Sequence, residues 1–177
     1  MRSETDKIKL EQFLTALGKS VRGPGQIFLT GGSTALLFGW RQMTVDIDLK
    51  AAPEPVGFFE AIAKLKDELD VNVELASPDQ FIPEVPGWRE RSLFIARHGE
   101  IDFLHYDPVS QALAKIERGH ARDLVDVAAM LERKMVSPEQ LWESYLLIEP
   151  ELLRFPAIDP STFRSGVVAI CRPSGET

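Results

Sequence analysis

The chain has very little cysteine and no long apolar run, and both shortages limit what it can be. Its 177 residues include one cysteine, Cys171, which excludes an intramolecular disulfide framework and fits a reducing compartment. No apolar stretch approaches the roughly 20 residues of a membrane-spanning helix. Residues 1–12 lack the apolar core of a signal peptide. We therefore expect a cytoplasmic protein that does not enter a membrane.

Positive charge is also scarce. The 20 Lys and Arg residues are outnumbered by 27 Asp and Glu, so the net charge is -7. This balance disfavours broad non-specific binding to nucleic acid, which needs a basic surface, but it leaves room for a local basic groove that grips one RNA end. The three histidines are not spaced as a metal-binding set, and no serine lies in a nucleophile-elbow sequence.

What is present is an ordinary globular composition, 44% hydrophobic and 27% charged. The apolar periodicity predicts an α/β (α+β) fold in which a small mixed sheet carries helices on one side. We expect residues 1–106 to form a catalytic domain and 107–177 a helical C-terminal region packed on it. Strands are expected at 27–30, 45–49, 71–75, 92–96 and 100–105, and helices at 3–21, 34–38, 58–69, 107–118, 121–135, from 137 and in the tail.

The most informative stretch is 26–50. A short apolar strand, 27–30, breaks at Gly31-Gly32-Ser33 and is followed by a short helix. Glycines let the backbone approach a ligand closely, and amides at a helix N-terminus favour an anion such as phosphate. Gly31, Gly32 and Ser33 are therefore predicted to bind the phosphates of a nucleotide.

The same stretch ends in an alternating strand that carries two acidic residues. Since strand side chains switch faces at each position, Asp46 and Asp48 share one face and the apolar residues around them share the other. Neighbouring carboxylates repel unless a cation lies between them, and oxygen ligands suit Mg²⁺ or Mn²⁺. A phosphate-binding turn followed by a metal-binding strand implies a metal-bound nucleoside triphosphate.

Gly32-Ser33, twelve intervening residues and Asp46-Ile47-Asp48 resemble the signature of the nucleotidyltransferase (polymerase-β-like) superfamily. The resemblance implies that Asp46 and Asp48 are catalytic and bind metal. It also implies a third carboxylate on a later strand with an apolar-Asp-apolar pattern, and Asp102 is our choice for this metal ligand. Glu100 is expected on the same face and competes with Asp102 for this role.

A second polar series, Lys115, Arg118, Arg122, Asp123 and Asp126, follows the predicted hairpin. It resembles the Lys…Arg-Asp-x-x-Asp segment of AbiE-type abortive-infection toxins and their uncharacterised relatives. The resemblance implies that the first four of these residues bind the nucleotide. A lysine supplies a mobile charge for phosphate, and an arginine can bind two oxygens at once. The alternative is ordinary pairing between charges on a helix surface.

A proline-rich segment, 77–91, is expected to be a surface loop with one short extended piece, and it contains Trp88, Arg89 and Arg91. These side chains could stack on a base and pair with phosphate. The alternative, which we favour, is that Trp88 packs at the edge of the core and the arginines are solvated.

The sequence leaves three functions open. The first is transfer of a nucleoside monophosphate to RNA, such as a tRNA, or to protein, by a toxin with a possible antitoxin partner. The second is a small-molecule nucleotidyltransferase of the aminoglycoside-modifying type. The Gly39-Trp40-Arg41 stretch before Asp46 resembles the Gly-x-Arg-like stretch that precedes Asp-x-Asp-Leu in such enzymes. The third is a nucleotide-binding partner protein without catalysis. The base of the triphosphate, the acceptor and the oligomeric state are not encoded in any pattern that we recognise.

Overall fold

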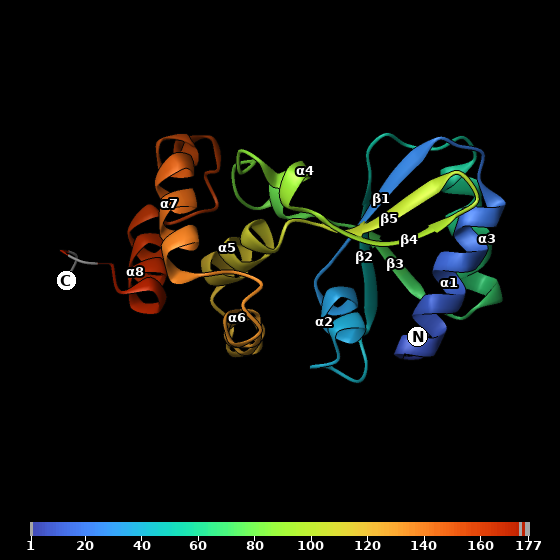
Figure 1. Ribbon diagram of the computed structural model, residues 1–177, viewed down its shortest axis with the longest axis horizontal. Coiled ribbons are helices and arrows are strands. Elements are labelled where there is room, and N and C mark those ends of the chain that lie inside the picture. The colour runs from blue at the N-terminus through green and yellow to red at the C-terminus, as the bar shows by residue number, and fades with distance from the viewer. Residues whose placement is uncertain (1, 174, 176–177) are drawn as a thin grey trace. The chain divides into compact units, whose positions relative to one another are not determined.

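The computed structural model describes residues 2–173 and 175, and in these residues five strands form one open mixed sheet. β1 lies at its centre, antiparallel to β2 and parallel to β5, in the order β3-β2-β1-β5-β4 (Figure 1). The α+β class expected from the sequence is confirmed. The strands are β1 (Gly25–Thr30), β2 (Asp46–Ala51), β3 (Asn72–Leu75), β4 (Leu93–His98) and β5 (Ile101–His105).

The chain divides into two compact units. The first consists of residues up to 77 together with 92–106, and it holds the sheet with α1 (Lys7–Ser20), α2 (Gly32–Phe38) and α3 (Phe58–Glu68). The second consists of 78–91 and the residues from 107 onward. It holds η1 (Pro78–Gln80), α4 (Trp88–Arg91), α5 (Pro108–Arg118), α6 (Ala121–Glu132), α7 (Pro138–Ile148), η2 (Glu149–Arg154) and α8 (Pro160–Cys171).

The core of the first unit lies between one face of the sheet and α1 and α3. Ile47 and Leu49 on β2 are fully buried, whereas Asp46 and Asp48, which alternate with them, are only partly buried, so the predicted alternation is confirmed. Asp6 caps the N-terminus of α1, and its carboxylate accepts a hydrogen bond from Lys9 N at 2.8 Å. The buried side chains of α1 include Leu10, Phe13, Leu14 and Leu17, and they pack with Ile27, Leu29, Ile101 and Phe103 from the strands.

The helices of the second unit begin and end where the sequence places caps. Asp107 lies before Pro108 and accepts hydrogen bonds from Val109 N at 3.0 Å and Ser110 N at 3.2 Å. Gly119 ends α5 with a φ of 70°, a left-handed conformation that favours glycine. Ser137 caps α7, as the sequence predicts, because its side chain accepts a hydrogen bond from Gln140 N. No helix of the described residues is long and apolar enough to cross a membrane.

Segment 78–91 is not the surface loop that the sequence predicts. It contains two helical turns, η1 and α4, and it belongs to the second unit. The physical reason is an anchor to α5, because Arg91 binds the buried carboxylate of Asp107 through two hydrogen bonds of 3.0 and 2.7 Å. This pairing reaches sixteen residues along the chain and has no local sequence signal.

Candidate functional site

The Gly31-Gly32-Ser33 turn joins β1 to α2, and its glycines are required by close contacts. Gly31 has a φ of 63°, and a Cβ atom there would lie 2.9 Å from Asp48 Oδ2. A Cβ atom at Gly32 would overlap the side chain of Thr44, whose Cβ lies 2.7 Å from that position. The turn therefore packs against both β2 and the segment that leads into it.

Ser33 has the chemical feature expected of a ligand-binding residue. Its side chain is fully buried, and its Oγ has no hydrogen-bond partner within the described part of the chain. Leaving a buried hydroxyl unpaired costs about 1–3 kcal/mol. With seven residues, α2 is too short for its dipole to attract an anion strongly. An anion at this turn would therefore depend mainly on the Ser33 hydroxyl and the backbone amides.

Asp48 lies directly beside this turn. In the β1–β2 register it is opposite Thr30, the last residue of β1. Asp46 lies two residues earlier on the same face, and both carboxylates are partly exposed. The phosphate-binding turn and the acidic pair predicted from sequence are therefore adjacent in the folded unit.

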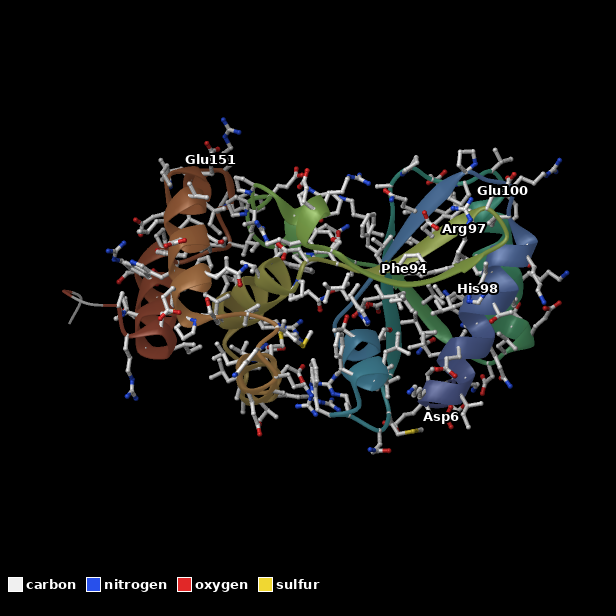
Figure 2. All side chains as sticks on the ribbon, viewed as in Figure 1. Asp6, Phe94, Arg97, His98, Glu100 and Glu151 are labelled. Atoms are coloured by element: carbon white, nitrogen blue, oxygen red, sulfur yellow. The ribbon has the colours of Figure 1, made fainter. Side chains whose placement is uncertain are left out.

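Asp102, the predicted third carboxylate, lies elsewhere on the sheet, and its competitor Glu100 lies just outside β5. Asp102 is opposite Gln26 on β1, four residues from the level of Asp48, or about 13 Å along a strand. It forms an ion pair with Arg97 at 3.1 Å. Glu100 lies in the β4–β5 turn (Figure 2) and accepts a hydrogen bond from Gly23 N at 3.1 Å.

Sequence reasoning missed the carboxylate nearest to Asp48 in the sheet register. Glu74 on β3 is the direct neighbour of Asp48, and Asn72 is the neighbour of Asp46. Parallel neighbours point to the same face. The available signal was the alternation Val73-Glu74-Leu75, which we predicted as a strand without giving Glu74 a role. Within residues 2–173 and 175, no group of three or more His, Cys, Asp or Glu side chains is arranged to hold a metal ion.

His105, the last residue of β5, contacts α2. Its Nδ1 lies 3.0 Å from Thr34 Oγ1, and its ring packs against Phe38 with a centroid separation of 4.8 Å. These contacts reach both ends of α2, which begins beside Ser33. Burial lowers the pKa of His105 from its ordinary 6.5 to about 4, so the imidazole is neutral at physiological pH.

We expect His105 to make the stability of the protein depend on pH. The unfolded chain takes up a proton near pH 6.5 while the native imidazole stays neutral down to about pH 4. The free energy of unfolding should therefore fall as the pH drops through this window, by roughly 3 kcal/mol at most. Urea unfolding at pH 7.5 and pH 4.5 should show a smaller loss in His105→Gln than in the native protein. Parallel losses in the two proteins would contradict this assignment.

The second polar series forms an ion-pair network between α5 and α6. Lys115 Nζ lies 2.9 Å from Asp126 Oδ2 and 3.7 Å from Asp123 Oδ1. Arg118 binds both oxygens of Asp123, at 2.7 and 2.5 Å. These pairs cross between two helices, so they are not the pairing along one helix surface that the sequence suggested as the alternative. Arg122 is exposed.

Burial in this network is deep. The side chains of Lys115, Asp123 and Asp126 are at most 10% exposed. Burial raises the pKa of Asp123, but the hydrogen bonds and charge of Arg118 and the charge of Lys115 outweigh it, so the pKa lies below its ordinary value. The network joins α5 to α6. The nucleotide-binding role predicted for Lys115, Arg118, Arg122 and Asp123 stays a prediction.

The Trp88 segment packs rather than stacking on a ligand. The Trp88 side chain is buried, and its Nε1 donates a hydrogen bond to the Glu84 carboxylate. Arg89 lies over the Trp88 ring at 4.8 Å. The packing interpretation of Trp88 is confirmed, but Arg91 is bound to Asp107 instead of being solvated.

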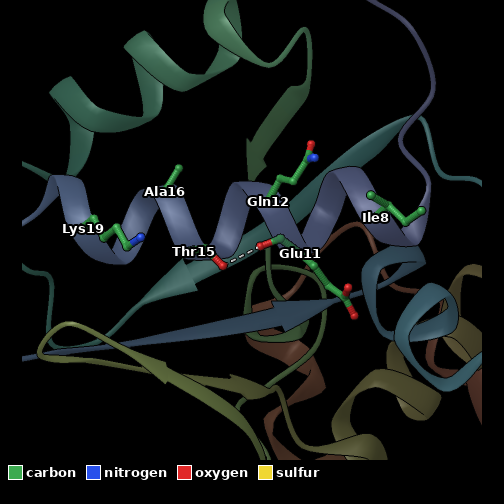
Figure 3. Close-up of a pocket in the computed structure, with 6 residues that line it drawn as sticks. All are labelled: Ile8, Glu11, Gln12, Thr15, Ala16 and Lys19. Atoms are coloured by element: carbon green, nitrogen blue, oxygen red, sulfur yellow. Dashed lines mark hydrogen bonds between the residues drawn. The ribbon is translucent and has the colours of Figure 1, made fainter.

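A separate hollow follows the outer face of α1 (Figure 3). It is shallow and lined by a single helix, in which Thr15 Oγ1 donates a hydrogen bond to Glu11 O at 3.0 Å. A hydroxyl bonded within its own helix offers little to a ligand, so we assign this hollow no part in the site. Its lining residues are Ile8, Glu11, Gln12, Thr15, Ala16 and Lys19.

Comparison with known proteins identifies the family. The family described as nucleotidyltransferase of unknown function (DUF6036) matches residues 8–148. No curated protein and no solved structure matches the chain significantly. The matched range includes the Gly31–Ser33 turn, Asp46 and Asp48, and the network at Lys115, which agrees with the superfamily resemblance of the sequence. Closeness to AbiE-type toxins stays a prediction. The chain belongs to the DUF6036 family of nucleotidyltransferases.

Proposed function

We propose that the first unit binds a nucleoside triphosphate with Mg²⁺ or Mn²⁺ and transfers its nucleoside monophosphate to an acceptor. The observation that supports this most strongly is the contact between Gly31 and Asp48, where a Cβ atom would lie 2.9 Å from the carboxylate. A turn that can approach phosphate and a carboxylate that can bind a cation are there in direct contact. Ser33 Oγ adds a buried hydroxyl without a partner in the described chain.

Asp46 and Asp48 would hold the metal. Their oxygens are the ligands that magnesium and manganese prefer, and their partial exposure leaves room for water and phosphate oxygens. A bound divalent cation would neutralise charge on the phosphates and polarise the α-phosphoryl group. We propose Glu74, in place of Asp102, as the third carboxylate, because the register places Glu74 beside Asp48.

The remaining groups bind and orient the triphosphate. The amides of Gly31 and Gly32 and the hydroxyl of Ser33 would hold its β- and γ-phosphates. The acceptor oxygen then attacks the α-phosphorus, the bond from that phosphorus to the β-bridging oxygen breaks, and pyrophosphate leaves with the bonding electrons. The acceptor proton passes to a carboxylate or to solvent. Holding the reactants in line supplies much of the rate enhancement of such a reaction.

Ser33→Ala should separate binding from stability. Removal of a buried hydroxyl that lacks a partner is expected to leave the free energy of unfolding unchanged or to raise it by about 1 kcal/mol. The rate of nucleotidyl transfer is expected to fall by about 10- to 100-fold, since one phosphate donor is lost. Urea unfolding and initial rates measure the two effects. A clear loss of stability would contradict our description of Ser33.

For the acceptor we propose an RNA, such as a tRNA, or a protein, in a toxin whose activity an antitoxin would restrain. The support is the Arg122-Asp123-x-x-Asp126 segment, which resembles that of AbiE-type toxins. An aminoglycoside-type acceptor is the second candidate, because a net charge of -7 would attract a cationic small molecule.

The acceptor class can be measured by transfer of label. Triphosphates labelled at the α-phosphate are incubated with Mg²⁺ or Mn²⁺ and total RNA, total protein or aminoglycosides. Asp46→Asn/Asp48→Asn is the inactive variant, and Glu60→Gln, an exposed carboxylate on α3, is the matched control. Label in one pool with the native protein and Glu60→Gln identifies the acceptor. Tight triphosphate binding without transfer to any pool would favour a non-catalytic binding protein.

A further inference from the structure

The segment between α2 and β2 turns back toward the phosphate-binding turn. It leaves α2 at Gly39, and Trp40 N donates a hydrogen bond to Ala35 O at 3.2 Å. It then reaches the start of the same helix, because a Cβ atom at Gly32 would lie 3.1 Å from Arg41 Nη1. A guanidinium group therefore lies beside the residue between Gly31 and Ser33.

The position of this segment is fixed by its next contacts. Thr44 and Thr5 exchange two backbone hydrogen bonds, at 2.8 and 2.9 Å. The Thr44 hydroxyl also donates to Asp46 O at 3.1 Å. Thr44 thus ties the segment to the strand that carries the acidic pair. Arg41, three residues earlier, is half-buried, and its guanidinium group lies next to Gly32.

The charges explain what Arg41 can do there. Asp46 and Asp48 together with a triphosphate bring about six negative charges, and one or two divalent cations, with two to four positive charges, offset only a part of this sum. An arginine stays protonated at all physiological pH values and can donate to two phosphate oxygens at once. Negative charge also grows on the leaving pyrophosphate as the bond to the α-phosphorus breaks.

We propose that Arg41 binds the β- and γ-phosphates of the triphosphate held at Gly31–Ser33 and stabilises the pyrophosphate as it leaves. This inference rests on the proposed function. It assigns a direct contact to a residue outside the Gly-Gly-Ser turn and the Asp-x-Asp strand. It also predicts that the contribution of Arg41 to binding depends on the polyphosphate chain and is the same for every nucleobase.

The test compares Arg41→Gln and Arg41→Lys with the native protein and with Arg22→Gln, an exposed arginine of the same unit as the matched control. Calorimetry in Mg²⁺ measures binding of inorganic tripolyphosphate, a non-cleavable ATP analogue and AMP. Tripolyphosphate makes the result independent of the base. Melting temperatures without ligand show whether each variant is folded.

We expect Arg41→Gln to weaken tripolyphosphate and analogue binding by about 10- to 100-fold and AMP binding by less than about threefold, because two charge-assisted hydrogen bonds are lost. Arg41→Lys keeps the charge but cannot donate to two phosphate oxygens from one planar group, so its loss of affinity should be intermediate. Equal losses for AMP and tripolyphosphate, or unchanged affinities in folded variants, would overturn the role of Arg41. Absence of triphosphate binding by the native protein would instead overturn the proposed function. If Arg41→Gln does not fold, Arg41→Lys alone decides, by a selective loss for tripolyphosphate or by its absence.

Discussion

Asp48→Asn is expected to reduce nucleotidyl transfer by at least about 10³-fold, which corresponds to about 4 kcal/mol of transition-state stabilisation. The carboxylate lies against the Gly31 turn and beside Glu74 in the sheet register, so its loss would remove the proposed metal ligand where the phosphates would bind. An amide keeps the shape but neither the charge nor the affinity for magnesium. Initial rates with the identified acceptor measure the effect.

Stability gives this prediction its control. Without ligand, Asp48→Asn should unfold at the same urea concentration as the native protein or slightly above it, because one of two neighbouring negative charges is gone. Mg²⁺ with a non-cleavable triphosphate should raise the melting temperature of the native protein and of Glu60→Gln, but not that of Asp48→Asn. An Asp48→Asn variant that keeps both its rate and its stabilisation by magnesium would remove Asp48 from the site.

Lys115→Met should lower the free energy of unfolding by about 3 kcal/mol, the second large effect that we expect. The lysine lies 2.9 Å from Asp126, whose side chain is 2% exposed. Its removal leaves a buried carboxylate without its principal cation. Arg154→Met, which removes an exposed ion pair with Glu151 in the same unit, should cost less than about 1 kcal/mol.

A double variant separates charge from packing. Lys115→Met/Asp126→Leu replaces the buried pair by apolar side chains and should recover at least about half of the loss, because no unpaired charge remains. Urea unfolding of the native protein, the single variants and the double variant measures the coupling. Independent, additive losses would contradict a buried pair. Triphosphate affinity of the double variant then tests the predicted phosphate role of Lys115.

The parts of the site that could be predicted from sequence are those set by local pattern. The turn at Gly31–Ser33 follows from glycines after an apolar strand, and the shared face of Asp46 and Asp48 follows from the period of a strand. That Glu74, and not Asp102, is the register neighbour of Asp48 depends on strand order and register. These are set by packing between distant segments and leave no mark in a short motif.

The ion pairs of the charged network also could not be predicted from a local sequence pattern. A family resemblance predicted nucleotide binding for Lys115 and its neighbours in sequence, but the partners of Lys115 depend on how α5 and α6 pack after the break at Gly119. The Pro-rich segment is similar, since α4 is anchored by Arg91 and Asp107, sixteen residues apart. Composition predicted a loop there because prolines and glycine dominate its local preference.

The most direct test of nucleotidyl transfer uses one triphosphate labelled in two ways. The protein is incubated with Mg²⁺, the acceptor pools and a triphosphate labelled at either the α- or the γ-phosphate, with Asp46→Asn/Asp48→Asn in parallel. Our account predicts label in the acceptor from the α-position only, release of the γ-label as pyrophosphate, and neither event with the variant. Transfer of the γ-label to the acceptor, or release of γ-label as free phosphate without α-transfer, would contradict it.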